Sequence, residues 1–214
     1  DFIIQMLIRN QHIDENCILG IWEITESKEE LLALYPKNLQ QEAIKHIRKM
    51  KSEKRIIEWL SVRLMLSLLL NEEKMVYHKS NGQPYLMDNS YNISISHTNK
   101  YAAILLHRHK KVGIDIEEIS ERVHNVASKF ISEDEFIDES QKSVHRLLHW
   151  SAKETLFKLM DVEEIDFKKH LRLDKFIPAK KGIITAQETK TNKKSRFNIF
   201  YEVHPTYVLT WSMQ

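Results

Sequence analysis

The sequence predicts an α+β fold made of two similar halves, and two internal similarities point to it. Leu19-Gly20-Ile21-Trp22 resembles Val112-Gly113-Ile114-Asp115, and Trp59-Leu60-Ser61-Val62-Arg63 resembles Trp150-Ser151-Ala152-Lys153-Glu154. Both halves therefore read as a strand, then helices, then a helix headed by Trp. An ancient duplication and a chance match explain two such short similarities equally well, so both explanations stay open.

The first half is expected to hold a strand, helices and then further strands. Residues 38–70 contain neither Gly nor Pro, and their apolar residues recur at helical spacings, with a kink near Lys51-Ser52 that gives two helices. Residues 91–97 alternate as a strand does, and Asn81-Gly82-Gln83-Pro84 is a clear turn. The expected elements are, in chain order: a strand at 18–24, a helix at 28–34, helices over 38–70, the turn, and strands at 91–97 and 101–107.

The second half is expected to begin with a strand, continue with helices and end in strands joined by basic turns. A helix over 121–139 would place four apolar residues on one face, and Ser132-x-x-Glu135 is a capping box that could start a new helix. The expected elements are, in chain order: a strand at 112–117, helices at 121–139 and 142–160, and strands at 171–173, 182–186, 196–203 and 207–212.

Composition excludes several classes of protein. The four glycines are too scattered for a P-loop or a dinucleotide-binding fingerprint. One cysteine, Cys17, excludes an internal disulfide and a multi-cysteine zinc site, and it points to a reducing compartment. A net charge of +2 lacks the basic excess of a dedicated nucleic-acid binder. The longest apolar run, 64–70, is far shorter than a membrane span. Without an initiator Met, the sequence is expected to belong to a longer gene product.

Asp115 and Glu117 are the most informative pair of residues. Successive side chains of a strand point to opposite faces, so these two carboxylates share one face, roughly 7 Å apart, while Ile114 and Ile116 face the core. Two neighbouring acids destabilise each other's charge unless a cation compensates. Mg²⁺ suits this role because it takes oxygen ligands and keeps positions for phosphates. The alternative is an ordinary solvated strand end.

Glu154 and Lys158 lie four residues apart on an expected helix whose buried side is marked by Trp150 and Phe157. One interpretation is a plain surface ion pair. In the other, Glu154 supplies a third carboxylate to the metal, and Lys158 points at a phosphate as a point charge.

His97 closes the segment Ser94-Ile95-Ser96-His97 at the end of an expected strand. An imidazolium and a neighbouring hydroxyl suit phosphate oxygens, although a capping Ser beside a partly exposed His is the alternative. A Ser-His nucleophilic pair is poorly supported, because adjacent strand residues face opposite ways and no hydrolase elbow surrounds Ser96.

Two further groups of residues carry a weaker signal. His145 and His149 are spaced as metal ligands on a helix, but no third ligand can be identified, so chance is the better explanation. The basic stretch 45–55 reads as a solvated helix face, although its last residues Lys54 and Arg55, with Arg63, could fold onto an anionic ligand.

Taken together, these segments resemble the 4′-phosphopantetheinyl transferase superfamily, in its larger pseudo-dimeric type that activates peptide and polyketide synthases. The family pattern Gly-Ile-Asp-Ile-Glu stands at 113–117, and Trp-Ser-x-Lys-Glu-x-x-x-Lys stands at 150–158. The upstream Asn-Ile-Ser-His box has Ser94 in place of Asn, and the Gly-Lys-Pro turn has Gln83 in place of Lys. Helix 54–63 looks like the Arg-rich helix of the family's first half.

The resemblance implies two similar α/β subdomains related by a pseudo-twofold axis, with coenzyme A bound between them. Residues 1–108 would form the side that binds the 3′-phosphate and adenine, and 109–214 would hold the metal and dock the carrier. It implies Mg²⁺-dependent transfer of the 4′-phosphopantetheine arm to a serine of an acyl or peptidyl carrier protein, releasing adenosine 3′,5′-bisphosphate, as in the holo-[acyl-carrier-protein] synthase type. We expect a monomeric cytoplasmic enzyme that binds neither nucleic acid nor membrane.

The resemblance also implies roles for individual residues. Asp115, Glu117 and Glu154 would hold Mg²⁺, and Glu154, directly or through a water, would take the proton of the carrier serine. Lys158 would also act in catalysis, by contacting the diphosphate of coenzyme A. The residues implied in binding coenzyme A are Lys54, Arg55, Arg63, Ser96, His97 and Lys158.

The carrier protein is expected to be acidic and helical, and to dock on an apolar patch with basic neighbours. The candidate stretch is 123–136, just after the strand that carries Asp115 and Glu117. In and beside it, Val126, Phe130 and Ile131 would make apolar contacts, and Arg122 and Lys129 would supply positive charge. Alternatively, Val126 and Phe130 are core residues.

Two other functions compete with transfer. A noncatalytic coenzyme A-binding or interaction protein of the same fold is disfavoured because three close carboxylates are costly without a metal. A nucleic-acid binder would rest on the basic stretch 45–55 and predicts salt-sensitive binding.

Overall fold

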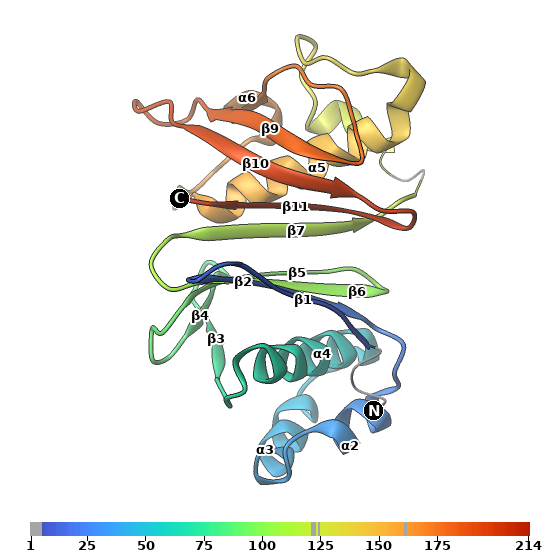
Figure 1. The fold of residues 1–214 in the computed structure, drawn as a ribbon, viewed down its shortest axis with the longest axis vertical. Helices are drawn as coiled ribbons and strands as arrows, with labels where there is room; N and C mark the ends of the chain where they lie inside the picture. Colours follow the sequence, from blue (N-terminus) through green and yellow to red (C-terminus); the bar gives the residue numbers. More distant parts are fainter. Residues whose placement is uncertain (1–5, 121–122, 124, 161) are drawn as a thin grey trace. The chain divides into compact units, whose positions relative to one another are not determined.

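The computed structural model describes residues 6–120, 123, 125–160 and 162–214. Within these ranges the chain divides into two compact units, with the boundary between Arg108 and His109. The fold is mixed α/β with antiparallel sheets (Figure 1). Each unit buries a hydrophobic core of its own, so each is described by itself.

The first unit contains a four-stranded antiparallel sheet in the order β1-β2-β6-β5, a separate two-stranded hairpin β3-β4, and three helices. Helix α4 packs against β2 and β6, and α2 packs against α4 (Figure 1). The elements are β1 (Leu7–Asp14), β2 (Cys17–Glu23), α2 (Lys28–Leu34), α3 (Lys37–Ile47), α4 (Glu53–Leu70), β3 (Val76–His78), β4 (Pro84–Leu86), β5 (Asn92–His97) and β6 (Tyr101–His107).

Local sequence explains where these helices begin. Ser27 caps α2 in a capping box, because its hydroxyl accepts from the backbone N–H of Glu30 while the Glu30 carboxylate accepts from the backbone N–H of Ser27. Ser52 caps α4 by accepting from the backbone N–H of Arg55. The break between α3 and α4 therefore falls where the kink is predicted.

The second unit contains a five-stranded antiparallel sheet in the order β7-β11-β10-β9-β8. Helix α5 lies along β7, β11 and β10 (Figure 1). The elements are β7 (Val112–Glu118), the 3-10 helices η2 (Ala127–Lys129) and η3 (Glu139–Gln141), α5 (Lys142–Leu159), α6 (Phe167–His170), β8 (Leu171–Leu173), β9 (Lys181–Glu188), β10 (Arg196–Val203) and β11 (Tyr207–Met213).

A glycine brings α5 unusually close to β7. A Cβ atom added at Gly113 would lie 2.3 Å from the backbone oxygen of Thr155, a distance that no real side chain tolerates. The same contact region is tied by hydroxyl hydrogen bonds, because Thr210 of β11 meets Ser151 at 2.8 Å and Thr155 at 2.7 Å. The helix is therefore fixed directly over the strand that carries Asp115.

Most predicted elements are confirmed, and the errors fall in particular places. The helix predicted over 121–139 is wrong, because the described residues there form only short stretches of 3-10 helix, turns and irregular chain. Glu135 Oε2 accepts from the backbone N–H of Ser132, which is one half of a capping box, but the backbone N–H of Glu135 donates to the backbone oxygen of Ser132 instead of its hydroxyl, and no α-helix begins there. Strands β1, β3 and β4 are not predicted from the sequence.

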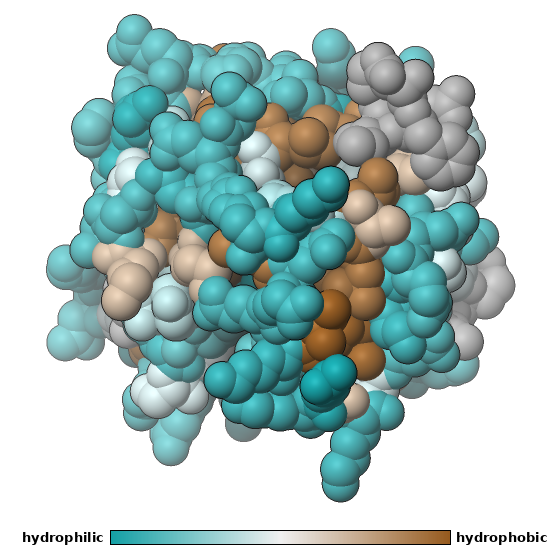
Figure 2. Space-filling model, turned by 90° about the horizontal axis from the view of Figure 1, so that it is seen from below, coloured by the Kyte–Doolittle hydropathy of each residue, from teal (hydrophilic) through white to brown (hydrophobic). Residues whose placement is uncertain are grey.

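The surface seen in Figure 2 is mainly hydrophilic, and hydrophobic side chains are exposed there in patches bounded by hydrophilic ones. Among the described residues, no helix combines the length and the apolar character that crossing a membrane requires.

Candidate functional site

Strand β7 and helix α5 together position the acidic residues of the second unit. On β7, residues 113, 115 and 117 share one face, and Gly113 lies against α5, so Asp115 and Glu117 face that helix. On α5, Trp150, Glu154 and Lys158 follow one another at intervals of four residues and lie along one side. The structure therefore brings the strand acids and the helix residues to a common site.

Direct contacts join the two elements. The Lys158 ammonium donates to Asp115 Oδ1 at 2.9 Å and to the backbone oxygen of Ile114 at 2.8 Å. The indole N–H of Trp150 donates to Glu117 Oε1 at 2.7 Å. Asp115 is only 3% exposed, which rules out a solvated strand end. Lys158 thus binds across to the strand, and the interpretation as a plain surface pair with Glu154 is wrong.

Electrostatics show that the three carboxylates affect one another. Burial, and then the neighbouring Asp115, raise the pKa of Glu154 to about 7, while Lys158 opposes this shift. Burial and Asp115 also raise the pKa of Glu117 to about 7; the Trp150 hydrogen bond lowers it and Glu154 raises it further. Asp115 therefore makes the ionisation of Glu117 and of Glu154 less favourable, and Glu154 adds to the effect on Glu117, which is the situation that an added cation relieves.

The donor set fits a hard divalent cation in its chemistry. Three carboxylates supply oxygen ligands of the kind that Mg²⁺ takes together with water and phosphate oxygens. As they stand in the described part of the chain, no three His, Cys, Asp or Glu side chains are arranged around a metal position. The cation that lies beside Asp115 in this structure is the Lys158 ammonium.

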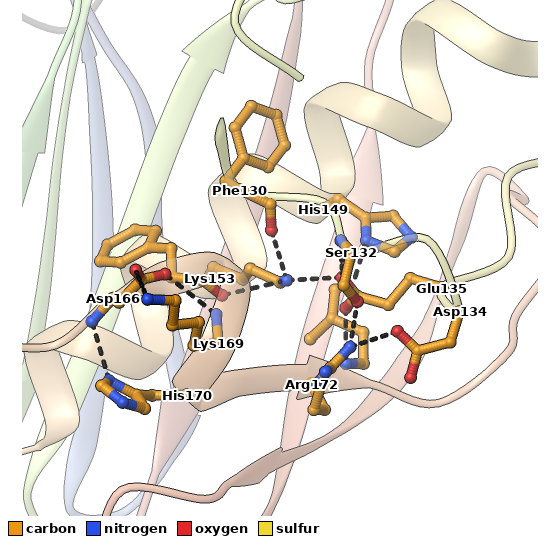
Figure 3. A network of polar contacts seen from close by, with 12 residues as sticks. Phe130, Ser132, Asp134, Glu135, His149, Lys153, Asp166, Lys169, His170 and Arg172 are labelled. Carbon is orange, nitrogen blue, oxygen red and sulfur yellow. Dashed lines mark hydrogen bonds and ion pairs between the residues drawn. The ribbon is translucent and has the colours of Figure 1, made fainter. Parts of the chain in front are cut away.

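Lys153, the residue before Glu154, serves a different part of the unit (Figure 3). Its fully buried ammonium donates to the backbone oxygens of Phe130 at 2.6 Å and Phe167 at 3.3 Å, and to Glu135 Oε2 at 2.7 Å. Glu135 in turn accepts from the backbone N–H of Leu173 at 2.9 Å. The helix that presents Glu154 is thereby anchored to the segment before it and to the start of α6. Sequence reasoning gave Lys153 no role.

A second group of contacts in Figure 3 involves the segment 132–135. Arg172 of β8 forms an ion pair with Asp134 and a hydrogen bond to the Ser132 hydroxyl. His149 lies 3.8 Å from Glu135 Oε1. Burial lowers the pKa of His149 to about 3, so its ring is neutral at physiological pH. His149 and His145 are both buried, and His149 stacks on the Phe176 ring while His145 meets the same ring edge-on.

The segment predicted to dock a carrier protein is only partly a surface. Phe130 is 1% exposed and belongs to the core of the second unit, so its prediction as an apolar contact is wrong. Val126 is exposed, and Ile131 is half-buried against the core. Lys129 is exposed. Arg122 lies outside the described residues.

In the first unit, residues predicted to bind coenzyme A surround a cavity of about 460 Å³. Arg55, Arg63 and His97 line it. Lys54 is not on its wall, and Ser96 points to the opposite face of β5 from His97 because strand side chains alternate. The residues that line the cavity are Met50, Arg55, Glu58, Trp59, Val62, Arg63, His78, Ile95 and His97.

Arg63 is held rigidly at the wall of this cavity. Its guanidinium lies over the Trp59 ring, 3.7 Å from the centroid, and donates to the backbone oxygens of Trp59 at 3.3 Å and Val76 at 3.1 Å. Burial lowers the pKa of Arg63 to about 10, which leaves it charged at neutral pH. The cavity therefore has a fixed positive charge suited to an anion.

Two residues of the cavity, Glu58 and His78, were missed by sequence reasoning. His78 ends β3, a three-residue strand that is too short for any periodicity to predict. Glu58 did leave a signal, since it stands four residues after Lys54 on the same helix, but only the tertiary structure brings it to His97.

Two comparisons with known proteins include the part of the chain that carries these residues. Residues 111–211 match the family model for the 4′-phosphopantetheinyl transferase superfamily. The chain is also 27% identical over 172 residues to the 4′-phosphopantetheinyl transferase gsp of Aneurinibacillus migulanus, in an alignment that covers 77% of this chain and 69% of that relative. The segment matched by the family model contains both β7 and α5, and with them Asp115, Glu117, Glu154 and Lys158.

Proposed function

Because this chain belongs to the 4′-phosphopantetheinyl transferase superfamily, we propose that it transfers the 4′-phosphopantetheine arm of coenzyme A to a serine of an acyl or peptidyl carrier protein. The serine oxygen would form a bond to the β-phosphorus of the coenzyme's diphosphate. The bond from that phosphorus to the bridging oxygen would break, and adenosine 3′,5′-bisphosphate would leave. The observation that supports this most is the group of Asp115, Glu117, Glu154 and Lys158 on two facing elements, with Asp115 buried and the other three half-buried.

The acidic residues would have two tasks. Asp115, Glu117 and Glu154 would hold Mg²⁺, which when bound would neutralise the diphosphate and the charge that develops on the leaving group. Lys158, which now neutralises Asp115 at 2.9 Å, would turn its ammonium toward the diphosphate oxygens as a point charge. Trp150 would keep Glu117 oriented through its hydrogen bond.

Glu154 is also the residue we propose for proton transfer. A general base works best when its pKa is near the working pH, and burial beside Asp115 raises the pKa of Glu154 to about 7. It would take the serine proton directly or through a water as the new phosphoester bond forms.

The first unit would hold the nucleotide end of coenzyme A, and the second unit would hold the metal and the carrier. Support for the first assignment comes from the cavity of about 460 Å³ lined by Arg55, Arg63 and His97. The overall activity would be that of a holo-[acyl-carrier-protein] synthase type enzyme.

The test is carrier modification. The purified chain would be incubated with coenzyme A, Mg²⁺ and each of several apo-carrier proteins, and the carriers would be weighed by mass spectrometry. We expect a gain of one phosphopantetheine group on the carrier serine. Binding of coenzyme A with no such gain on any carrier would instead indicate a noncatalytic coenzyme A-binding protein.

A further inference from the structure

Glu58 is an acidic residue placed among the cations of the first unit's cavity. It belongs to the buried side of α4, with a side chain only 11% exposed, and it lines the cavity together with Arg55, Arg63 and His97. A carboxylate removed from water is costly unless cations or donors compensate it. The residues around Glu58 must therefore compensate the charge of its carboxylate.

Two basic side chains lie within ion-pair distance of the same Glu58 oxygen. Oε1 is 3.4 Å from His97 Nδ1 and 3.7 Å from the Lys54 ammonium. Lys54 is largely exposed and approaches from the preceding turn of α4, as the partner in a weak surface pair does. His97 comes from β5, a separate element, and its side chain is 44% exposed at the cavity. The contact with His97 is thus the one that joins helix to strand.

The orientation of the His97 ring follows from this contact. The two ring nitrogens lie on opposite edges of an imidazole, so a ring whose Nδ1 faces Glu58 turns Nε2 away from that carboxylate. An imidazolium donates from both nitrogens. One His97 ring can therefore donate to Glu58 on one side and to an oxygen of an anion in the cavity on the other.

We propose that Glu58 is a positioning residue for anion binding: it holds His97 through Nδ1, so that Nε2 donates to a phosphate oxygen of the nucleotide. This inference rests on the proposed function, because it takes coenzyme A as the ligand. Glu58 does not touch the ligand and acts through His97. Its negative charge also repels the ligand, and the proposal states that the oriented hydrogen bond outweighs this repulsion.

Direct binding is the first measurement. Isothermal titration calorimetry would give the Kd of coenzyme A and of adenosine 3′,5′-bisphosphate for the wild-type chain and for Glu58→Ala and Glu58→Gln. We expect Glu58→Ala to weaken both ligands roughly tenfold, the scale of a lost hydrogen bond to a charged group. Glu58→Gln, which keeps an acceptor oxygen, should lose less. Unchanged or tighter binding in Glu58→Ala would overturn the proposal.

Two controls separate positioning from charge and from folding. Glu53→Gln removes the same charge from an exposed position in the first turn of α4, and it should leave Kd unchanged; a loss equal to that of Glu58→Gln would refute the proposal. In a His97→Ala background, Glu58→Gln should cause no further loss. If it still weakens binding to the same extent, Glu58 does not act through His97. Glu58→Gln, nearly identical in shape, keeps the test valid if Glu58→Ala does not fold.

Carrier modification then distinguishes this inference from the proposed function. For the Glu58 variants, KM for coenzyme A should rise while kcat stays near the wild-type value. If the wild-type chain binds coenzyme A but modifies no carrier, the proposed function fails, and the calorimetric comparison still decides the role of Glu58. If the wild-type chain modifies carriers and Glu58→Ala has the same Kd and KM, the inference alone fails. A wild-type chain that binds neither ligand would overturn both.

Discussion

Replacing Glu154 by Gln should stabilise the metal-free protein at alkaline pH and have little effect at acid pH. The folded carboxyl keeps its proton up to about pH 7, whereas the ordinary carboxyl loses it near 4.5. Between these values the folded state binds more protons than the unfolded state, so the free energy of unfolding falls as the pH rises. The stabilisation from this group is complete below pH 4.5 and is lost once the pH passes 7.

The size of the effect follows from the pKa difference. A shift from 4.5 to about 7 corresponds to about 3 kcal/mol, at roughly 1.4 kcal/mol for each pH unit. Glutamine mimics the protonated carboxyl and cannot ionise. The variant should therefore exceed the unfolding free energy of the wild type by less than about 1 kcal/mol at pH 5 and by about 3 kcal/mol at pH 8. Glu117→Gln should behave similarly, but the two gains should not add, because Glu154 contributes to the raised pKa of Glu117.

Urea denaturation with EDTA at pH 5, 6, 7 and 8 measures this difference. The comparison must be between variant and wild type, because the low pKa of the buried His149 makes total stability change in the opposite direction over part of the range. Glu133→Gln, at an exposed position of the same unit, is the matched control and should show no such gain. A Glu154→Gln gain that is absent, or equal at pH 5 and pH 8, would refute the electrostatic account of the site.

Magnesium provides a second arm of the same experiment. Mg²⁺ that binds only the folded state should raise the unfolding free energy of the wild type by mass action, and more at pH 8 than at pH 5 because protons compete for the carboxylates. Glu154→Gln should respond less. Equal responses of both proteins at pH 8 would contradict the proposed metal ligand.

Lys153→Met should lower the unfolding free energy in urea by about 3–5 kcal/mol, because it leaves the Glu135 carboxylate buried without its cation; adding Glu135→Leu should recover part of the loss, and a wild-type midpoint for the single variant would refute this. Gly113→Ala should cost more stability than Gly20→Ala in the same assay, since the new methyl group meets the backbone of α5 in the first case and only the end of a leucine side chain in the second. Trp150→Phe should raise the pKa of the β7 carboxylate it contacts, measured by NMR titration, because the indole hydrogen bond lowers that pKa. Asp115→Ala or Glu154→Ala should abolish carrier modification while circular dichroism stays unchanged; normal turnover by either would overturn their roles.

The parts of the fold that the sequence predicted are those governed by local signals. Helix α2 has the predicted bounds because its capping box is formed by neighbouring residues. Strand β1 was missed because it is an edge strand whose side chains are mostly exposed, so it lacks the apolar alternation of a half-buried strand. The helix predicted over 121–139 failed because Lys153 requires the backbone oxygen of Phe130 and the carboxylate of Glu135, and irregular chain supplies both.

In the candidate site, too, the sequence predicted what local spacing determines and missed what depends on tertiary contacts. The spacing of Asp115 and Glu117 on a strand, and of Glu154 and Lys158 on a helix, was sufficient to place each pair on one face. No local pattern could show that Gly113 brings the two elements together, or that the indole of α5 binds the outer carboxylate of β7. The pairing of Glu58 with His97 joins residues from α4 and β5 and is likewise visible only in three dimensions.

The three acceptors of the Lys153 ammonium come from the chain before η3 and from the first residue of α6. If either stretch detaches from α5, the buried Lys153 ammonium loses some of its acceptors. Local opening of one stretch should therefore favour opening of the other. Amide hydrogen exchange would then report both stretches as a single cooperative unit, with protection factors that rise and fall together.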